Sequence, residues 1–126
     1  MVAPTLVDER IDAGRRLIEQ LDAHDFKVDS ALWLFLSEPA EWRLLIASEL
    51  VDTIGPRRTY EALQRTLNES QIPLALKEIS LVKPEDGLVR DLRSAITTGP
   101  GMPSIRFSGN TINGTFIEGA LIYRLR

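Results

Sequence analysis

The amino-acid sequence predicts a single α+β domain over residues 1–126, with a mainly antiparallel sheet of about five strands and three helices packed chiefly on one face. Two observations predict this class. Two pairs of apolar runs are each joined by a short turn, and three other segments repeat apolar residues at steps of three and four. The length suits one core, and the hydrophobic fraction of 44% is ordinary for a globular protein.

The first predicted helix covers residues 5–23, where Pro4-Thr5 is the start signal. Its apolar stripe includes Gly14, which lowers helix propensity and therefore indicates close packing of the backbone against a sheet. The opposite side of the segment mixes acidic and basic residues, which is typical of a face in contact with solvent.

Residues 31–48 are predicted as a hairpin with a four-residue loop. We expect Ser37 to lie opposite Trp42 and Phe35 opposite Leu44. Both faces of this strand pair are largely apolar, whereas a sheet with one wet face alternates apolar and polar residues. The strands are therefore central in the sheet, or helices cover one face and a partner subunit covers the other.

The next three elements are a helix from Gly55-Pro56 to about residue 69, a strand over residues 75–82 and a helix over residues 84–98. Gly99-Pro100-Gly101 ends the last of these helices. With the two hairpins included, the expected order is helix, strand, strand, helix, strand, helix, strand, strand.

The C-terminal segment is predicted as a second hairpin. Asn113-Gly114 favours a two-residue turn of the primed type, which sets Ile112 opposite Thr115. Continuing this register pairs Phe107 with Ala120, Ile105 with Ile122 and Arg106 with Leu121. Gly109 and Gly119 are candidate bulge sites that would shift the pairing.

Composition excludes several kinds of chemistry. Cysteine is absent, so the chain has no disulfide, thiolate nucleophile or cysteine-ligated metal. The glycines form no phosphate loop, dinucleotide fingerprint or nucleophile elbow, and we expect no cofactor and no metal. No apolar run approaches the roughly 20 residues that span a bilayer, and the first residues lack a secretion signal. We therefore expect a cytoplasmic protein without membrane contact.

Arg57 and Arg58 stand at the start of the second predicted helix, where unpaired backbone N–H groups already carry partial positive charge. The third helix instead begins with two acidic residues. Two guanidinium groups beside open N–H groups predict a candidate site for phosphate, nucleic-acid backbone or another anion. The alternative is that Asp52 or Glu61 pairs with these arginines and closes the site.

Glu118 lies opposite Gly109 in the predicted register, on the same face as Phe107, which is unusual for a carboxylate unless it is paired or functional. A shift of one residue would reverse its direction. A small enzyme site around Glu118 and Arg106 is therefore one hypothesis. The single histidine, His24, follows the first helix and is better interpreted as a residue that interacts with the helix dipole than as a base or metal ligand.

The tip of the second hairpin is a candidate contact surface. Phe116 lies beside the turn with Ile112 and Ile117, and an apolar cluster at a turn has little local core to bury it. These three residues, together with Tyr123, are candidates for contact with a partner protein. The alternative is that the tip folds back over a helix.

These patterns favour a non-enzymatic protein-binding or assembly module, with a homodimer or larger homo-oligomer as one form. The observation behind this hypothesis is the two-sided apolar character of the strands, with only three helices to cover them. Anion or nucleic-acid-backbone binding and the small enzyme site remain as alternatives. The isoelectric point of about 5.2 weighs against generic nucleic-acid binding.

Overall fold

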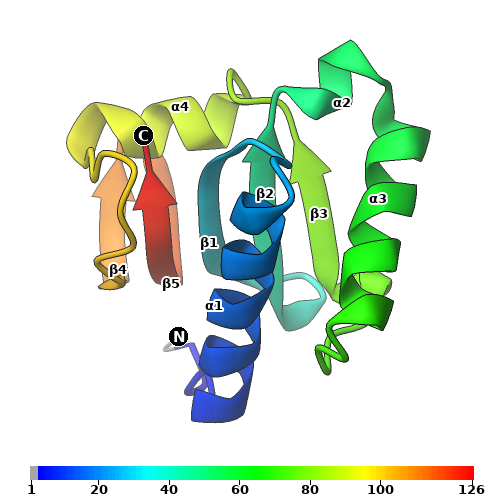
Figure 1. Ribbon diagram of the computed structural model, residues 1–126. Coiled ribbons are helices and arrows are strands. Elements are labelled where there is room, and N and C mark those ends of the chain that lie inside the picture. The colour runs from blue at the N-terminus through cyan, green and yellow to red at the C-terminus, as the bar shows by residue number, and fades with distance from the viewer. Residues whose placement is uncertain (1–2) are drawn as a thin grey trace.

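The computed structural model describes residues 3–126 as one α+β domain (Figure 1). The predicted order of helices and strands is confirmed, with one additional short helix, α2. The elements are α1 (Asp8–Ala23), β1 (Val28–Ser37), β2 (Ala40–Ser48), α2 (Leu50–Thr53), α3 (Pro56–Glu69), the 3-10 turn η1 (Leu76–Glu78), β3 (Ile79–Val82), α4 (Gly87–Ala95), β4 (Ile105–Ile112) and β5 (Thr115–Leu125).

The five strands form one sheet in the order β3-β2-β1-β5-β4. Three of the four neighbouring pairs are antiparallel, and β2 and β3 are parallel. The parallel pair arises because the chain leaves β2 and crosses over through α3 before it enters β3. The sheet is therefore mixed rather than purely antiparallel.

The first hairpin has a shorter loop than predicted. Ser37 pairs with Ala40, so the turn consists of two residues, and Phe35 pairs with Trp42 rather than with Leu44. The predicted register is wrong by two residues because Ala40 and Glu41, which the prediction places in the loop, already pair with β1 as part of β2. A slip of two positions keeps every side chain on its predicted face, and the Phe35 and Trp42 rings pack edge to face at 5.5 Å.

Both faces of the sheet are covered within one chain. Helices α1 and α3 cover one face, where Leu17, Ile18 and Leu63 pack in the same buried cluster as Trp33 and Leu44. Helix α4 lies on the opposite face and crosses the upper end of the sheet in Figure 1. The two-sided apolar character of β1 and β2 therefore reflects helices on both sides.

On the α4 face, Val89 and Leu92 from the helix pack against Leu32 and Ile122 from the sheet. The helix starts at Gly87 because Asp86 caps it, where a carboxylate oxygen accepts a hydrogen bond from the Leu88 N–H at 3.2 Å. It is shorter than the predicted 84–98.

The C-terminal hairpin has the predicted register, including the Ile112–Thr115, Phe107–Ala120 and Arg106–Leu121 pairs. The glycines do not shift the pairing along this hairpin. They accompany a bend, however, because Gly109 has a φ of +63° and the alternation of faces is interrupted there. Ile117 and Ala120 lie in the same buried cluster although a regular strand would place them on opposite faces.

The bend folds the hairpin tip onto α4. Ile112 packs against the cluster that contains Val89 and Leu92. The side-chain amide of Asn113 donates a hydrogen bond to the Ser94 hydroxyl of α4 at 2.8 Å. The tip is therefore secured to the helix rather than projected into solvent.

Within residues 3–126, the helices are all too short or too polar to cross a membrane. This finding matches the absence of long apolar runs in the sequence.

Candidate functional site

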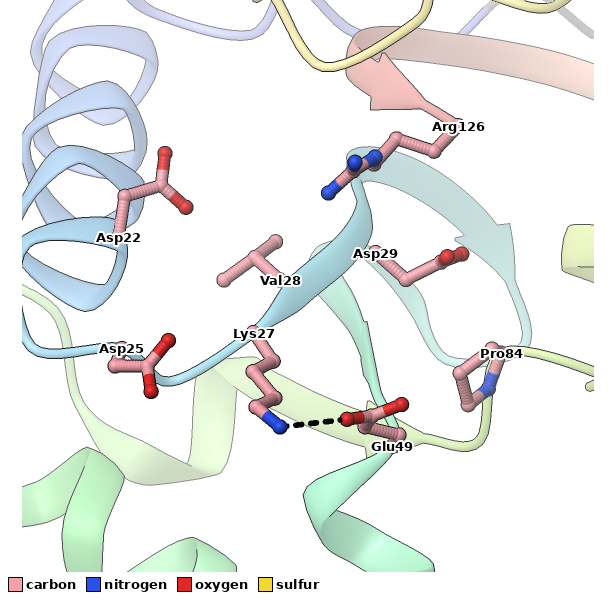
Figure 2. A pocket seen from close by; sticks show the side chains of 8 residues that line it. All are labelled: Asp22, Asp25, Lys27, Val28, Asp29, Glu49, Pro84 and Arg126. Carbon is pink, nitrogen blue, oxygen red and sulfur yellow. Dashed lines mark ion pairs between the residues drawn. The ribbon is translucent and has the colours of Figure 1, made fainter.

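A polar pocket of about 380 Å³ opens at the end of the sheet where β2 and β3 finish (Figure 2). Its carboxylates are Asp22, Asp25, Asp29 and Glu49, and its cations are Lys27 and Arg126. The Lys27 ammonium lies 3.0 Å from a Glu49 carboxylate oxygen. This hydrogen bond and the negative charge of Glu49 raise the pKa of Lys27 above its ordinary value.

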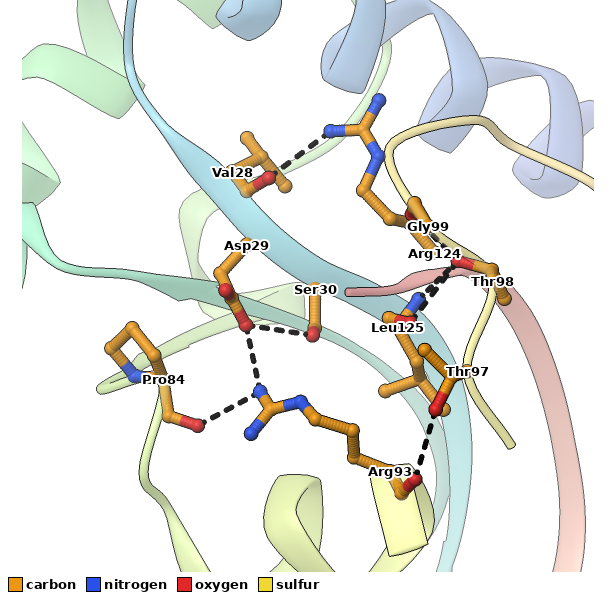
Figure 3. Close-up of polar contacts among 10 residues, drawn as sticks. All are labelled: Val28, Asp29, Ser30, Pro84, Arg93, Thr97, Thr98, Gly99, Arg124 and Leu125. Carbon is orange, nitrogen blue, oxygen red and sulfur yellow. Dashed lines mark hydrogen bonds and ion pairs between the residues drawn. The ribbon is translucent and has the colours of Figure 1, made fainter. Parts of the chain in front are cut away.

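Two of the pocket carboxylates hold secondary-structure elements together. Asp22 at the end of α1 accepts two hydrogen bonds from the buried Arg124 guanidinium, at 2.7 and 3.0 Å. Asp29 accepts one from Arg93 of α4 at 2.7 Å, and Arg93 also donates to the Pro84 carbonyl (Figure 3). These carboxylates are occupied by structural partners.

The pocket does not gather a metal-binding set. Among the described residues, no group of three or more histidine or carboxylate side chains is close enough to hold a metal ion. His24 caps α1 at the surface, where its Nδ1 lies 2.7 Å from the Gln20 carbonyl oxygen. This position agrees with the helix-end interpretation of the histidine.

The two arginines at the start of α3 do not form an enclosed site. The Arg57 side chain is 94% exposed, and its Nε lies 3.5 Å from a Glu61 oxygen one turn on. Arg58 is also exposed. Asp52 pairs instead with Lys83 at 2.9 Å, and this ion pair lowers the pKa of Asp52. The pairing of Arg57 with Glu61 corresponds to the alternative considered from the sequence.

Arg106 and Glu118 are not brought together. Arg106 is exposed and lines a hollow of about 310 Å³ beside the N-terminal segment Ala3–Leu6. Glu118 lines a separate groove between β1 and β5. Among residues 3–126, neither side chain has an ion-pair partner. The structure therefore gives no support to a shared polar site.

Two of the four candidate contact residues are buried. Tyr123 is 0% and Ile117 is 3% exposed, because Tyr123 packs under α1 and the bend at Gly109 turns Ile117 toward α4. Ile112 is partly buried against the same cluster. Phe116 keeps the expected position, with 57% of its surface exposed.

The groove that Phe116 borders lies where the sheet splits. The β1–β5 ladder ends at the pair Leu34–Ala120, whereas β1 continues to Ser37 along β2. Beyond Leu34, β1 is therefore an edge strand on its β5 side in the described part of the chain. The groove has a volume of about 440 Å³ and is lined by residues 34–37, Leu88 and residues 115–118.

The carboxylate of Glu118 is the one charged side chain among the residues that line this groove. Its Oε2 is buried and has no hydrogen-bond donor within residues 3–126. An unpaired buried polar atom costs free energy that a suitable partner would recover. Glu118, Phe116 and Ile117 are the three sequence-predicted site residues that line this one groove.

Leu36 and Leu88 in the groove were not among the predicted site residues. They lie far apart in the sequence, and their proximity depends on the packing of α4 and on the split between β1 and β5. The sequence signal that pointed to this region was the carboxylate in an apolar strand.

The chain matches no known family model, no curated protein and no solved structure at a significant level. Its function must therefore be argued from the geometry of these surfaces.

Proposed function

We propose that this chain is a non-enzymatic protein-binding module that receives an extended segment of a partner protein in the groove between β1 and β5. The observation that supports this proposal is the early end of the β1–β5 ladder at Leu34–Ala120. Among the described residues, positions 35–37 of β1 have a strand neighbour on the β2 side alone. An unpaired strand edge offers a row of backbone N–H and C=O groups to an incoming peptide.

The side chains around this edge favour a peptide over a small polar ligand. Leu34, Leu36, Leu88 and Phe116 supply apolar walls. Phe116 is one of three large apolar side chains that are exposed among the described residues, and the other two, Val7 and Ile54, lie outside the groove. Extended peptides in known binding modes place alternate side chains in such pockets while their backbone extends the sheet.

A displayed library of random twelve-residue peptides tests the proposal. The library is selected on the immobilised protein and counterselected on the Phe116→Arg variant, which fills the groove mouth with a charged side chain. Ile54→Arg is the matched control, because Ile54 is 40% exposed and lies outside the groove. We expect peptides that bind the unmodified protein and the Ile54→Arg variant but bind Phe116→Arg at least tenfold more weakly.

Two results would contradict this function. One is a library that enriches no peptide, and the other is a set of peptides that bind Phe116→Arg and Ile54→Arg equally. Far-UV circular dichroism of both variants confirms that each retains the fold before binding is compared.

A further inference from the structure

We infer that the groove selects a lysine or arginine side chain in the segment it binds, and that Glu118 is the residue that recognises it. This inference rests on the proposed function and adds the chemistry of the partner. Glu118 lines the groove as a partly exposed residue, and one of its carboxylate oxygens, Oε2, is buried without a hydrogen-bond donor within residues 3–126. A cationic donor that reaches the Glu118 carboxylate would form a charge-assisted hydrogen bond and neutralise its charge.

The aromatic ring beside Glu118 favours a cation as well. Phe116 and Glu118 are two residues apart on β5 and line the same groove. Phe116 is 57% exposed, whereas the intervening Ile117 is buried. A lysine or arginine placed on the carboxylate would thus also have the face of a phenyl ring within reach.

The apolar walls suit the stem of the same side chain. Lysine and arginine bury their methylene groups along apolar surface while the charged end reaches a polar partner. Leu36 of β1 and Leu88 of α4 line the groove from two other elements and provide that surface. A bare metal ion fits less well, because the groove contributes a single carboxylate and the described residues contain no cluster of three or more metal-binding side chains.

Within residues 3–126, Glu118 forms no ion pair that would account for a charge at this position. The Arg106 guanidinium, on the neighbouring strand, lines a different hollow. The seven ion pairs found within residues 3–126 include neither Glu118 nor Arg106. A carboxylate with one buried oxygen and no partner among the described residues is a feature typical of a binding site.

The test uses five pools of eight-residue peptides with randomised apolar and polar flanks. The pools differ at one central residue, which is Arg, Lys, norleucine, Gln or Glu. Dissociation constants are measured by fluorescence anisotropy for the unmodified protein, for Glu118→Gln and for Glu69→Gln. Glu69 is exposed at the end of α3, so this control removes one negative charge elsewhere.

We expect the Arg and Lys pools to bind the unmodified protein and Glu69→Gln about tenfold or more tightly than the norleucine pool. Glu118→Gln should lose this preference and bind all pools at the norleucine level. It should also unfold at the same or a higher urea concentration than the unmodified protein, because the neutral amide replaces a carboxylate whose buried Oε2 has no hydrogen-bond donor within residues 3–126.

The two proposals fail in different ways. If all five pools bind the unmodified protein equally, or if Glu118→Gln keeps the preference for Arg and Lys, the groove binds peptides but Glu118 does not select a cation. A Glu118→Gln protein that is strongly destabilised would show a structural role and also overturn the inference. If no pool binds any of the three proteins, the proposed function itself is wrong.

Discussion

Gly14 of α1 lies directly against the hydroxyl group of Tyr123 in β5. A Cβ atom at position 14 would overlap Tyr123 Oη and would lie 2.9 Å from Nε1 of Trp33. The Tyr123 hydroxyl in turn accepts a hydrogen bond from Trp33 at 3.0 Å and donates one to the carbonyl oxygen of Ile11 at 2.5 Å. The absence of a side chain at Gly14 thus allows a buried polar pair to connect the helix to two strands.

Replacing Gly14 with alanine should destabilise the protein although alanine favours helices. The added methyl group meets well-packed ring atoms on two strands, and such overpacking typically costs about 1–3 kcal/mol. Gly87→Ala is the control, because a Cβ at the exposed start of α4 has no heavy atom within 4 Å. Urea unfolding should show a lower midpoint for Gly14→Ala and an unchanged or higher midpoint for Gly87→Ala. Equal midpoints would contradict the close contact.

The Tyr123 hydroxyl predicts a loss of stability at alkaline pH. Burial raises the pKa of Tyr123 to about 12, against an ordinary value of 10.0. The Tyr123 hydroxyl makes its full contribution to the free energy of unfolding below pH 10, because it is protonated there in both the folded and the unfolded state. It decreases as the pH rises toward 12, by up to about 1.4 kcal/mol per pH unit, because the unfolded state alone releases the proton.

The Tyr123→Phe variant separates this effect from other alkaline titrations. The variant should lose roughly 1–3 kcal/mol at pH 8, because the buried Trp33 N–H loses its acceptor. Its free energy of unfolding should then decrease less between pH 10 and pH 11.5 than that of the unmodified protein. Parallel pH curves for the two proteins would show that the hydroxyl has no raised pKa.

The Arg124–Asp22 pair should matter more than a surface ion pair. The Arg124 side chain is 7% exposed and also donates to the carbonyl of Val28 at 3.1 Å. Asp22→Ala leaves a buried guanidinium with incomplete partners, and we expect a loss of roughly 2–3 kcal/mol in the free energy of unfolding. The loss is smaller than for a fully buried pair because Asp22 itself is partly exposed. Glu61→Ala, which removes the partner of the exposed Arg57, should change stability by less than about 0.5 kcal/mol. Similar losses in both variants would disagree with this ranking.

The bend at Gly109 should require a residue that tolerates a positive φ. A β-branched side chain at φ +63° is strained by roughly 1–2 kcal/mol, so Gly109→Val should lower stability. Gly101→Val is the control, because position 101 has neither a positive φ nor a neighbour within 4 Å. Amide hydrogen exchange should be faster for residues 110–117 in Gly109→Val, as the hairpin tip loosens from α4. Unchanged exchange there would show that the bend does not depend on glycine.

The protein should be a monomer when no other protein is bound. The predicted homo-oligomer rested on an uncovered apolar face of the sheet, but α4 and the bent hairpin bury that face within one chain. Multi-angle light scattering across a hundredfold range of concentration should therefore give a mass near 14.1 kDa. A stable dimer mass would instead require an interface at a strand edge or at Phe116, and Phe116→Arg would identify which of these is used.

Local sequence signals predicted much of the fold, because turn chemistry and hydrophobic periodicity act over a few residues. Asn113-Gly114 determined the register of the second hairpin, which the structure confirms pair by pair. Gly14 pointed correctly to close backbone packing. The register of the first hairpin was missed because apolar residues on both faces leave two loop lengths equally compatible with the pattern.

The candidate site depended on long-range packing that no local pattern encodes. Periodicity assigned Glu118 to an apolar strand, but it did not show that residues 115–119 of β5 lie apart from β1 or that Leu88 of α4 would face the resulting groove. The bend at Gly109 also exchanged the faces of Ile112 and Ile117 without changing their partners. Local sequence patterns were sufficient for the helices and strands and for the unusual carboxylate. The surface on which that carboxylate lies depends on strand separation and helix placement, because apolar burial acts over the whole chain.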